Sequence, residues 1–232
     1  MTTPKAVLLD VGGVLIVPNH DRIMGAFARG GFTPAIDLNR AHYAGAVQLT
    51  EERVRDVEWP HYWTSYLDAY ITECGVPDEL REEVHQHLDS EFSTNELWLQ
   101  VADGAHEGLR ALAATGVRLG IISNADGTVA EQLRRLEIAQ LGAGPGVEME
   151  VLLDSTVVGI AKPDPRIFAM ALDEMGLDAS DAWYVGDMPG FDVAGARAAG
   201  LRPFILDPFQ HHLGADYDRV DSLVTLAGMI NG

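Results

Sequence analysis

Short apolar runs alternate along this chain with longer stretches in which apolar residues recur every three or four positions. Five runs predict buried strands: Ala6–Leu9, Val117–Ile122, Glu150–Leu153, Trp183–Val185 and Pro203–Leu206. The stretches between the later runs predict amphipathic helices: His106–Ala114, Thr128–Leu136, Pro165–Met175 and Phe191–Ala199. Strands that are apolar throughout are typical of parallel sheets covered on both faces. The alternation therefore predicts an α/β fold with a doubly wound parallel sheet.

The stretch between the first and second predicted strands differs, because it shows helical periodicity and no clear strand. It predicts five helices: Asp21–Arg29, Leu38–Gly45, Thr50–Arg55, Glu58–Glu73 and Asp78–Glu91. We therefore expect a core formed by residues 1–16 and 99–232, and an inserted α-helical cap formed by residues 17–98. A cap inserted there would lie over the carboxyl edge of the sheet, where ligands bind in open α/β folds.

The composition is that of a globular protein with a large acidic excess. Of 232 residues, 47% are hydrophobic, and Asp and Glu number 35 against 16 Lys and Arg, for a net charge of −19. This charge disfavours nucleic acid and anionic membranes as partners, so any phosphate site must supply its own cations. Cys74 is the one cysteine, and the sequence shows neither a signal peptide nor a membrane-spanning run. We therefore expect a cytoplasmic protein, either a monomer or a homodimer.

Polar residues follow the predicted strands at positions that a parallel sheet would bring together. Asp10 ends the first strand, Ser123 follows the second, Lys162 comes after the third, and Asp187 and Asp192 come after the fourth. Each alone has an ordinary explanation, since Asp and Ser often cap helices or form turns, and a lone lysine is usually a surface residue. Together, and in this order, they indicate a site for a metal ion and an anion.

The order of these residues resembles the four sequence motifs of the haloacid dehalogenase superfamily. Residues 159–168, Gly-Ile-Ala-Lys-Pro-Asp-Pro-Arg-Ile-Phe, are especially close to the family pattern. The resemblance covers roughly the first sixteen residues and everything from about Trp98 onward. It implies a Rossmann-like core that carries a small helical cap, and hydrolysis of a small-molecule substrate.

The resemblance also implies roles for the motif residues. Asp10 would be the nucleophile and would form an aspartyl-phosphate, a known form of covalent catalysis by carboxylates. Mg²⁺ would be the cofactor, held by Asp10, the Gly12 carbonyl and Asp187. Asp192 would be a further ligand, or would orient one.

The remaining site residues would act on the substrate, a small phosphoester. Ser123 and Lys162 would hold the phosphoryl group as catalytic residues, and Lys162 would also neutralise Asp10. Asn124 and His20 are further candidates for substrate binding.

One position departs from the family pattern. Phosphatases of this superfamily usually carry a second Asp two residues after the nucleophile, where this chain has Gly12. That Asp protonates the leaving oxygen and later activates water, and such help contributes about 10²–10⁴-fold. Three explanations stay open. An acid could come from elsewhere, since Asn19, His20 and Asp21 lie shortly after the turn and histidine is the residue type suited to this task. The leaving group could instead be a good one or be served by water, or turnover could be lost while phosphate binding remains.

Two other branches of the superfamily fit the sequence less well. The dehalogenase branch usually lacks the acid that is Asp187 here, and it tends to carry a tyrosine at the position of Gly12. The phosphonate hydrolase branch needs a cap lysine, and no lysine occurs between Lys5 and Lys162. The sequence therefore predicts a Mg²⁺-dependent phosphatase of small phosphorylated metabolites. A non-catalytic phosphometabolite-binding or regulatory protein is the main alternative, and a 2-haloacid dehalogenase-type hydrolase is the other.

Overall fold

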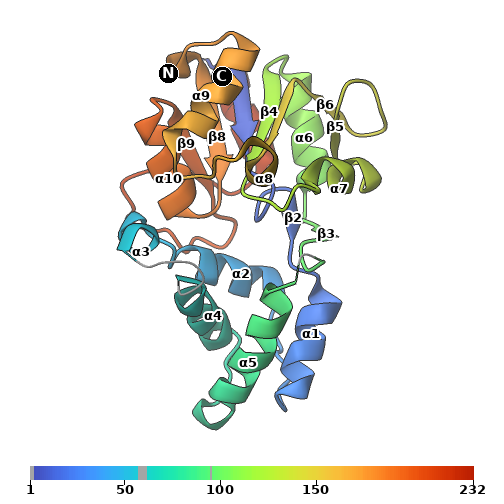
Figure 1. Ribbon diagram of the computed structural model, residues 1–232, viewed down its shortest axis with the longest axis vertical. Coiled ribbons are helices and arrows are strands. Elements are labelled where there is room, and N and C mark those ends of the chain that lie inside the picture. The colour runs from blue at the N-terminus through green and yellow to red at the C-terminus, as the bar shows by residue number, and fades with distance from the viewer. Residues whose placement is uncertain (1–2, 57–61, 95) are drawn as a thin grey trace.

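A six-stranded parallel sheet forms the centre of the molecule in a computed structural model that describes residues 3–56, 62–94 and 96–232 (Figure 1). The strands lie in the order β10–β9–β8–β1–β4–β7. Their bounds are β1 Ala6–Leu9, β4 Arg118–Ser123, β7 Val151–Asp154, β8 Ala182–Gly186, β9 Arg202–Leu206 and β10 Asp218–Val220. The five predicted strands are confirmed to within one residue at each end, and so is the parallel α/β architecture.

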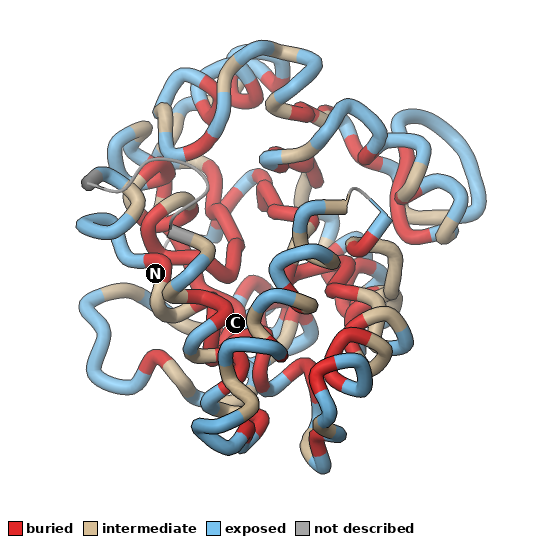
Figure 2. Tube along the Cα trace, turned by 60° about the horizontal axis from the view of Figure 1, so that its bottom comes forward, coloured by how far each residue is buried: buried red, intermediate tan, exposed pale blue. Residues whose placement is uncertain are grey.

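Successive residues of the central strand β1 pack against different layers of helices. Val7 and Leu9 join one apolar cluster with residues of α6 (Ala105–Ala114), α7 (Val129–Arg135) and α11 (Leu223–Asn231). Ala6 and Leu8 join another with residues of α9 (Pro165–Met175) and α10 (Pro189–Ala198). All four side chains are fully buried, because helices cover both faces of the sheet. In Figure 2 the buried segments accordingly run through the interior and the exposed ones lie around it.

Two short pairs of strands, one short helix and the 3₁₀ turn η2 (Ala179–Asp181) complete the part of the chain that contains the sheet. β2 (Ile16–Val17) pairs antiparallel with β3 (Gln100–Val101), at the points where the chain leaves the sheet region and returns to it. β5 (Ala139–Leu141) pairs in parallel with β6 (Val147–Met149) across the glycine-rich loop, and the helix α8 spans Ser155–Val158.

The inserted segment is helical and packs around its own apolar cluster, which includes Phe27, Tyr66 and Leu88. Its elements are α1 His20–Arg29, α2 Leu38–Ala46, α3 Glu51–Asp56, α4 Tyr62–Glu73, the 3₁₀ turn η1 Asp78–Leu80 and α5 Arg81–Phe92. The predicted start of the fourth helix, Glu58, lies outside the described residues. We call α1 to α5 the helical bundle.

The helical bundle lies at the end of the molecule opposite both chain termini, with α2 and α3 nearest the sheet region (Figure 1). Because β1 begins near the N-terminus, its carboxyl end points toward this bundle. α10 and the bundle meet directly, since the Gly190 N–H donates to the Leu49 carbonyl at 2.7 Å. No described helix has the length and apolarity needed to cross a membrane.

Candidate active site

The carboxyl edge of the sheet brings Asp10, Lys162, Asp187 and Asp192 into one buried cluster. Asp10 directly follows β1 and its N–H donates to the Val185 carbonyl of β8 at 2.8 Å, so the first and fourth motifs are adjacent. One ligand atom from each of the three carboxylates lies within 4.8 Å of the others. The structure therefore assembles the charged residues that the sequence singled out.

Lys162 supplies the positive charge at the centre of this cluster. Its Nζ lies 2.7 Å from Asp10 Oδ2 and 2.7 Å from Asp192 Oδ1, and it donates to the Tyr184 hydroxyl at 2.9 Å. The lysine is buried, and burial works against its charge, yet its carboxylate partners outweigh burial and raise its pKa above the usual range. Lys162 is therefore a fixed cation between two carboxylates.

Asn124 holds Lys162 in place through the main chain. The Asn124 side-chain oxygen accepts from Lys162 N at 2.8 Å, and its amide nitrogen donates to Lys162 O at 3.0 Å. Both ends of the amide are thus engaged, so the structure gives Asn124 a supporting place beside the lysine rather than a contact that faces a ligand. Ser123 is buried at the last position of β4, on the same edge of the sheet.

Asp192 organises the loop that follows β8. Its Oδ2 accepts from the N–H groups of Asp187 at 3.1 Å and Met188 at 2.8 Å. Its Oδ1 accepts from Lys162 and from the Tyr184 hydroxyl, the latter at 2.9 Å. Because both oxygens are already bonded, Asp192 is suited to orienting Asp187 and Lys162.

Asp187 is the acid that lacks hydrogen-bond partners. It is fully buried, and neither of its carboxylate oxygens has one. Burial and the nearby Asp192 raise the pKa of Asp187 well above its usual range, although Lys162 opposes this. A buried unpaired carboxylate is costly unless a cation joins it, and oxygen donors are what Mg²⁺ prefers. The residues present therefore fit a divalent cation bound by Asp187 and Asp10.

Asp10 remains reachable from solvent, with 11% of its side chain exposed. Its Oδ1 accepts from Val11 N at 2.7 Å, and Oδ2 faces Lys162. Burial raises the pKa of Asp10 to about 7; Lys162 opposes the rise, and Asp192 and Asp187 reinforce it. A bound cation would favour the ionised form that nucleophilic attack requires.

The two glycines after Asp10 differ in whether a side chain would fit at their positions. Gly13 has φ of +68°, and a Cβ there would lie 2.1 Å from an Asp187 carboxylate oxygen, so only glycine fits. At Gly12 a Cβ would lie 3.5 Å from the Trp98 ring, an ordinary contact. A longer side chain at position 12 would contact the Trp98 indole.

His20 lies in a different network. Its Nε2 lies 3.1 Å from Asn39 Oδ1 and its Nδ1 lies 3.0 Å from the Gln100 amide nitrogen. These contacts join the start of α1 to α2 and β3. The hydrogen bonds of His20 thus run to neighbouring segments rather than to the acidic cluster.

His42, which the sequence analysis did not single out, reaches the cluster from α2. It is 1% exposed, and its Nε2 lies 3.1 Å from Asp187 Oδ2 without forming a hydrogen bond. Its Nδ1 lies 2.7 Å from the Tyr66 hydroxyl, and burial lowers the pKa of His42 to about 3. A lone histidine within a helix carries no sequence signal, because most such residues simply pack.

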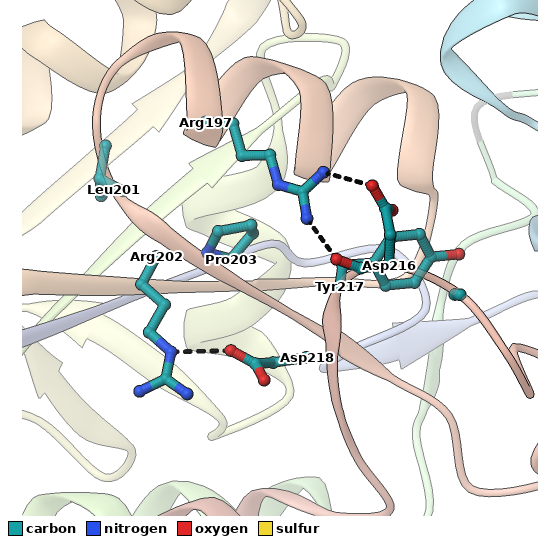
Figure 3. Close-up of a pocket in the computed structure, with 8 residues that line it drawn as sticks. Arg197, Leu201, Arg202, Pro203, Asp216, Tyr217 and Asp218 are labelled. Atoms are coloured by element: carbon teal, nitrogen blue, oxygen red, sulfur yellow. Dashed lines mark hydrogen bonds and ion pairs between the residues drawn. The ribbon is translucent and has the colours of Figure 1, made fainter. Parts of the chain in front are cut away.

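A separate hollow lies at the amino ends of β9 and β10, the edge opposite the acidic cluster (Figure 3). Both of its arginines are already paired. Arg197 lies 3.3 Å from Asp216, and Arg202 lies 2.7 Å from Asp218. The arginines of this hollow are therefore neutralised by its own aspartates. In the acidic cluster, by contrast, the Asp187 carboxylate has no hydrogen-bond partner.

Comparisons with known proteins agree with this geometry. The chain matches the model of a hydrolase family, haloacid dehalogenase-like hydrolase, over residues 4–200. It is 35% identical over 221 residues to a phosphoserine phosphatase of Thermus thermophilus, covering 88% of this chain and 81% of that protein. It is 30% identical over 156 residues to haloacid dehalogenase-like hydrolase domain-containing protein 3 of Danio rerio, covering 67% of this chain and 61% of that protein, less than two thirds of its length.

A solved structure extends the similarity to the whole fold. The crystal structure of a 2-haloacid dehalogenase from Pseudomonas syringae superposes with a TM-score of 0.55 and 26% identity, over 98% of both chains. The relatives thus include both a phosphatase and a dehalogenase, while the family model and the sheet topology agree with the resemblance seen in the motifs. The chain therefore belongs to the haloacid dehalogenase-like hydrolase family.

Proposed function

We propose that this hydrolase is a Mg²⁺-dependent phosphatase of small phosphorylated metabolites. The observation that carries the proposal is the pair of unpartnered Asp187 oxygens, buried beside Asp10 and next to the fixed cation of Lys162. A reaction at carbon needs no metal and would leave the Asp187 carboxylate without a partner. The similarity to a phosphoserine phosphatase supports the same choice.

Each motif residue has a task in this proposal. Asp10, the Gly12 carbonyl and Asp187 would hold Mg²⁺, with Asp192 orienting the loop, and the ion would neutralise charge around the phosphoryl group. A carboxylate oxygen of Asp10 attacks phosphorus, so an oxygen–phosphorus bond to Asp10 forms as the bond between phosphorus and the leaving oxygen breaks. Lys162 and Ser123 hold phosphoryl oxygens during this transfer. Water then attacks phosphorus and restores Asp10.

The division into a core and a cap belongs to the same proposal. Residues 17–98 would act as a cap over the core formed by residues 1–16 and 99–232, admitting substrate and then excluding water. The short β2–β3 pair, where the chain crosses between the two parts, is a reasonable place for the motion. A cytoplasmic location fits the single cysteine, Cys74, which is free and buried.

Phosphate release from a panel of small phosphoesters, with and without Mg²⁺, tests the proposal. We expect release that requires the metal and that Asp10→Asn abolishes. Asp187→Asn should weaken Mg²⁺ binding measured by calorimetry, which separates loss of the metal from loss of the nucleophile. Metal-independent release of halide from a 2-haloacid would instead establish the dehalogenase reaction.

A binding or regulatory role is the second candidate, and Gly12 is the observation that favours it. The position that usually supplies the acid has no side chain. If the native protein binds Mg²⁺ and phosphate but releases none from any ester, this second role replaces the first.

A further inference from the structure

His42 presents an unpartnered ring nitrogen to the acidic cluster from the helical bundle. Its Nε2 is buried and has no hydrogen-bond partner, although it lies 3.1 Å from Asp187 Oδ2. Buried polar atoms in folded proteins nearly always have partners, and exceptions mark sites completed by something else. Asp187 is unpartnered too, so two elements that are distant in sequence leave polar atoms facing each other.

The surroundings of His42 fix which ring nitrogen carries the proton. A neutral imidazole carries a proton on only one of its ring nitrogens, and Nε2 is the nitrogen that faces the cluster. Once a bound cation ionises Asp187, a lone pair on Nε2 would face the carboxylate at 3.1 Å, which is unfavourable, whereas an N–H there is attracted to it. The Tyr66 hydroxyl then donates to Nδ1. The neutral ring therefore directs an N–H donor toward the cluster.

Trp98 connects His42 to the position of the missing acid. The Trp98 ring would lie 3.5 Å from a Cβ at Gly12, and the same ring meets His42 edge-on, with ring centroids 5.6 Å apart. The indole therefore occupies the neighbourhood of the absent carboxyl group. His42 packs against the same indole, with its Nε2 facing the metal-binding acid.

We propose that Nε2–H of His42 donates a hydrogen bond to the phosphoester oxygen that leaves, in place of the acid missing at Gly12. This inference rests on the proposed phosphatase function. A neutral histidine used as a hydrogen-bond donor is an established catalytic device. When Asp10 attacks phosphorus, the electron pair of the breaking bond goes to the leaving oxygen, and His42 stabilises that charge without giving up its proton.

Water balances the protons in this scheme. The leaving alkoxide takes a proton from water to become the alcohol. The resulting hydroxide attacks the phosphorus of the aspartyl-phosphate, and the products are hydrogen phosphate and the free Asp10 carboxylate. The overall reaction consumes one water, and no other acid is needed.

Three variants separate the donor from the packing role of the ring. His42→Met fills a buried space without a donor, while His42→Gln keeps an amide N–H at a similar reach. His87→Gln, on α5 of the same bundle, is the matched control. We expect His42→Met to lower kcat on an alkyl phosphate by about 10- to 100-fold, the value of one hydrogen bond to a charged group. His42→Gln should recover part of this loss.

The leaving group gives a readout that a packing role would not move. p-Nitrophenolate leaves with little help, so His42→Met should lose much less kcat on p-nitrophenyl phosphate than on an alkyl phosphate. Equal losses on the two substrates, or a His42→Met enzyme as active as the native one, would overturn the proposal.

Binding of inorganic phosphate tests the same donor without turnover. One phosphate oxygen occupies the leaving position, so calorimetry with Mg²⁺ present should show about 10-fold weaker phosphate binding in His42→Met. The Kd for Mg²⁺ alone should not change; if it rises, His42 acts on the metal and the proposal is wrong. A native protein that releases no phosphate from any ester, and yet binds phosphate with an affinity that depends on His42, would refute the phosphatase function. The same result would support the hydrogen bond from His42 to a phosphate oxygen. If the native protein does not bind phosphate, or if His42→Met binds it as tightly as the native protein does, the proposed hydrogen bond from His42 is refuted.

Discussion

Two buried carboxylates with raised pKa values, Asp10 and Asp187, make the stability of the metal-free protein depend on pH. The pKa of Asp10 is raised to about 7, and that of Asp187 is raised as well. An acid with a raised pKa in the folded state favours folding in its protonated form. Its contribution is fully present below the unfolded pKa, near 4, and is lost as pH rises through about 7.

We therefore expect Mg²⁺ to stabilise the protein more at high pH than at low pH. In EDTA, Asp10→Asn should raise Tm relative to the native chain at pH 8 and change it little at pH 4, because the amide carries no charge. Mg²⁺ should raise the native Tm by several degrees at pH 8 and by much less at pH 5. Scanning calorimetry measures both effects, and a Mg²⁺ effect that does not grow with pH would contradict this account of the acidic cluster.

The stability of the protein also depends on how a side chain at position 12 fits against Trp98. A methyl group at position 12 meets the indole at an ordinary distance. A carboxyl group extends further, so we expect it to displace the indole. Gly12→Ala should therefore be tolerated, and Gly12→Asp should lower Tm by several degrees. Trp98→Ala should restore part of that loss when combined with Gly12→Asp. Thermal melts of the four proteins give the coupling energy, and additive effects would show that the two positions do not interact.

Among the elements, α2 explains why sequence reasoning singled out the clustered residues at the strand ends but missed His42. Eight of the nine residues of α2 are buried, Arg40 being the exception. A helix buried on all sides is packed between other elements. Here α2 contacts α4 through Gly45, against Tyr66, and its Tyr43 hydroxyl donates to the Gly13 carbonyl at 2.6 Å. The sequence predicts this helix, but only its packing reveals that His42 faces Asp187.

The strand ends were predictable for a different reason. Most residues of each predicted run are apolar, which is a pattern that the sequence shows, and the residue after such a run must lie at the sheet edge. β10 was missed because only Val220 of its three residues is buried. β5 and β6 are equally short, with three residues each, so local pattern gives too little signal. His20 was a candidate partly because it follows Asp10 closely in the sequence, but nearness in sequence does not reveal that the chain enters α1 at this residue.

The contact between α10 and the helical bundle supports a prediction at the scale of elements. A Cβ at Gly190 would lie 2.6 Å from the Thr50 carbonyl oxygen, which is main chain and cannot rotate away. Gly190→Ala should push the bundle from the sheet region and lower both Tm and turnover. Gly228→Ala in α11 is the matched control, because nothing lies within 4 Å and alanine favours a helix by about 0.5–1 kcal/mol. Equal Tm values for the two variants would show that this contact does not seat the bundle.

Charge over the whole molecule bears on which substrates are favoured. The bundle's arginines have partners among the described residues: Arg22 and Arg29 bind Glu91, Arg40 binds Glu73, Arg53 binds Gln48, Arg55 binds Glu51, and Arg81 binds Thr72. The protein also carries a net charge of −19. Four of these six arginines thus pair with glutamates, so a substrate with a second anionic group would meet repulsion and few arginines whose charge is not already neutralised. We expect a higher kcat/KM for phosphoesters with neutral tails than for those with a carboxylate tail.

Ionic strength tests this expectation, because salt screens long-range repulsion. The Debye length falls from about 30 Å at 0.01 M to about 8 Å at 0.15 M, so added salt should lower KM, and more so for the substrate with the extra carboxylate. KM measured for glycolate phosphate and for an alkyl phosphate of similar size, at both salt concentrations and fixed Mg²⁺, gives the comparison. A KM that rises with salt for the carboxylate ester would mean that a cation of this chain binds the tail. Identical salt effects for both substrates would instead place the tail outside the field of the acidic surface.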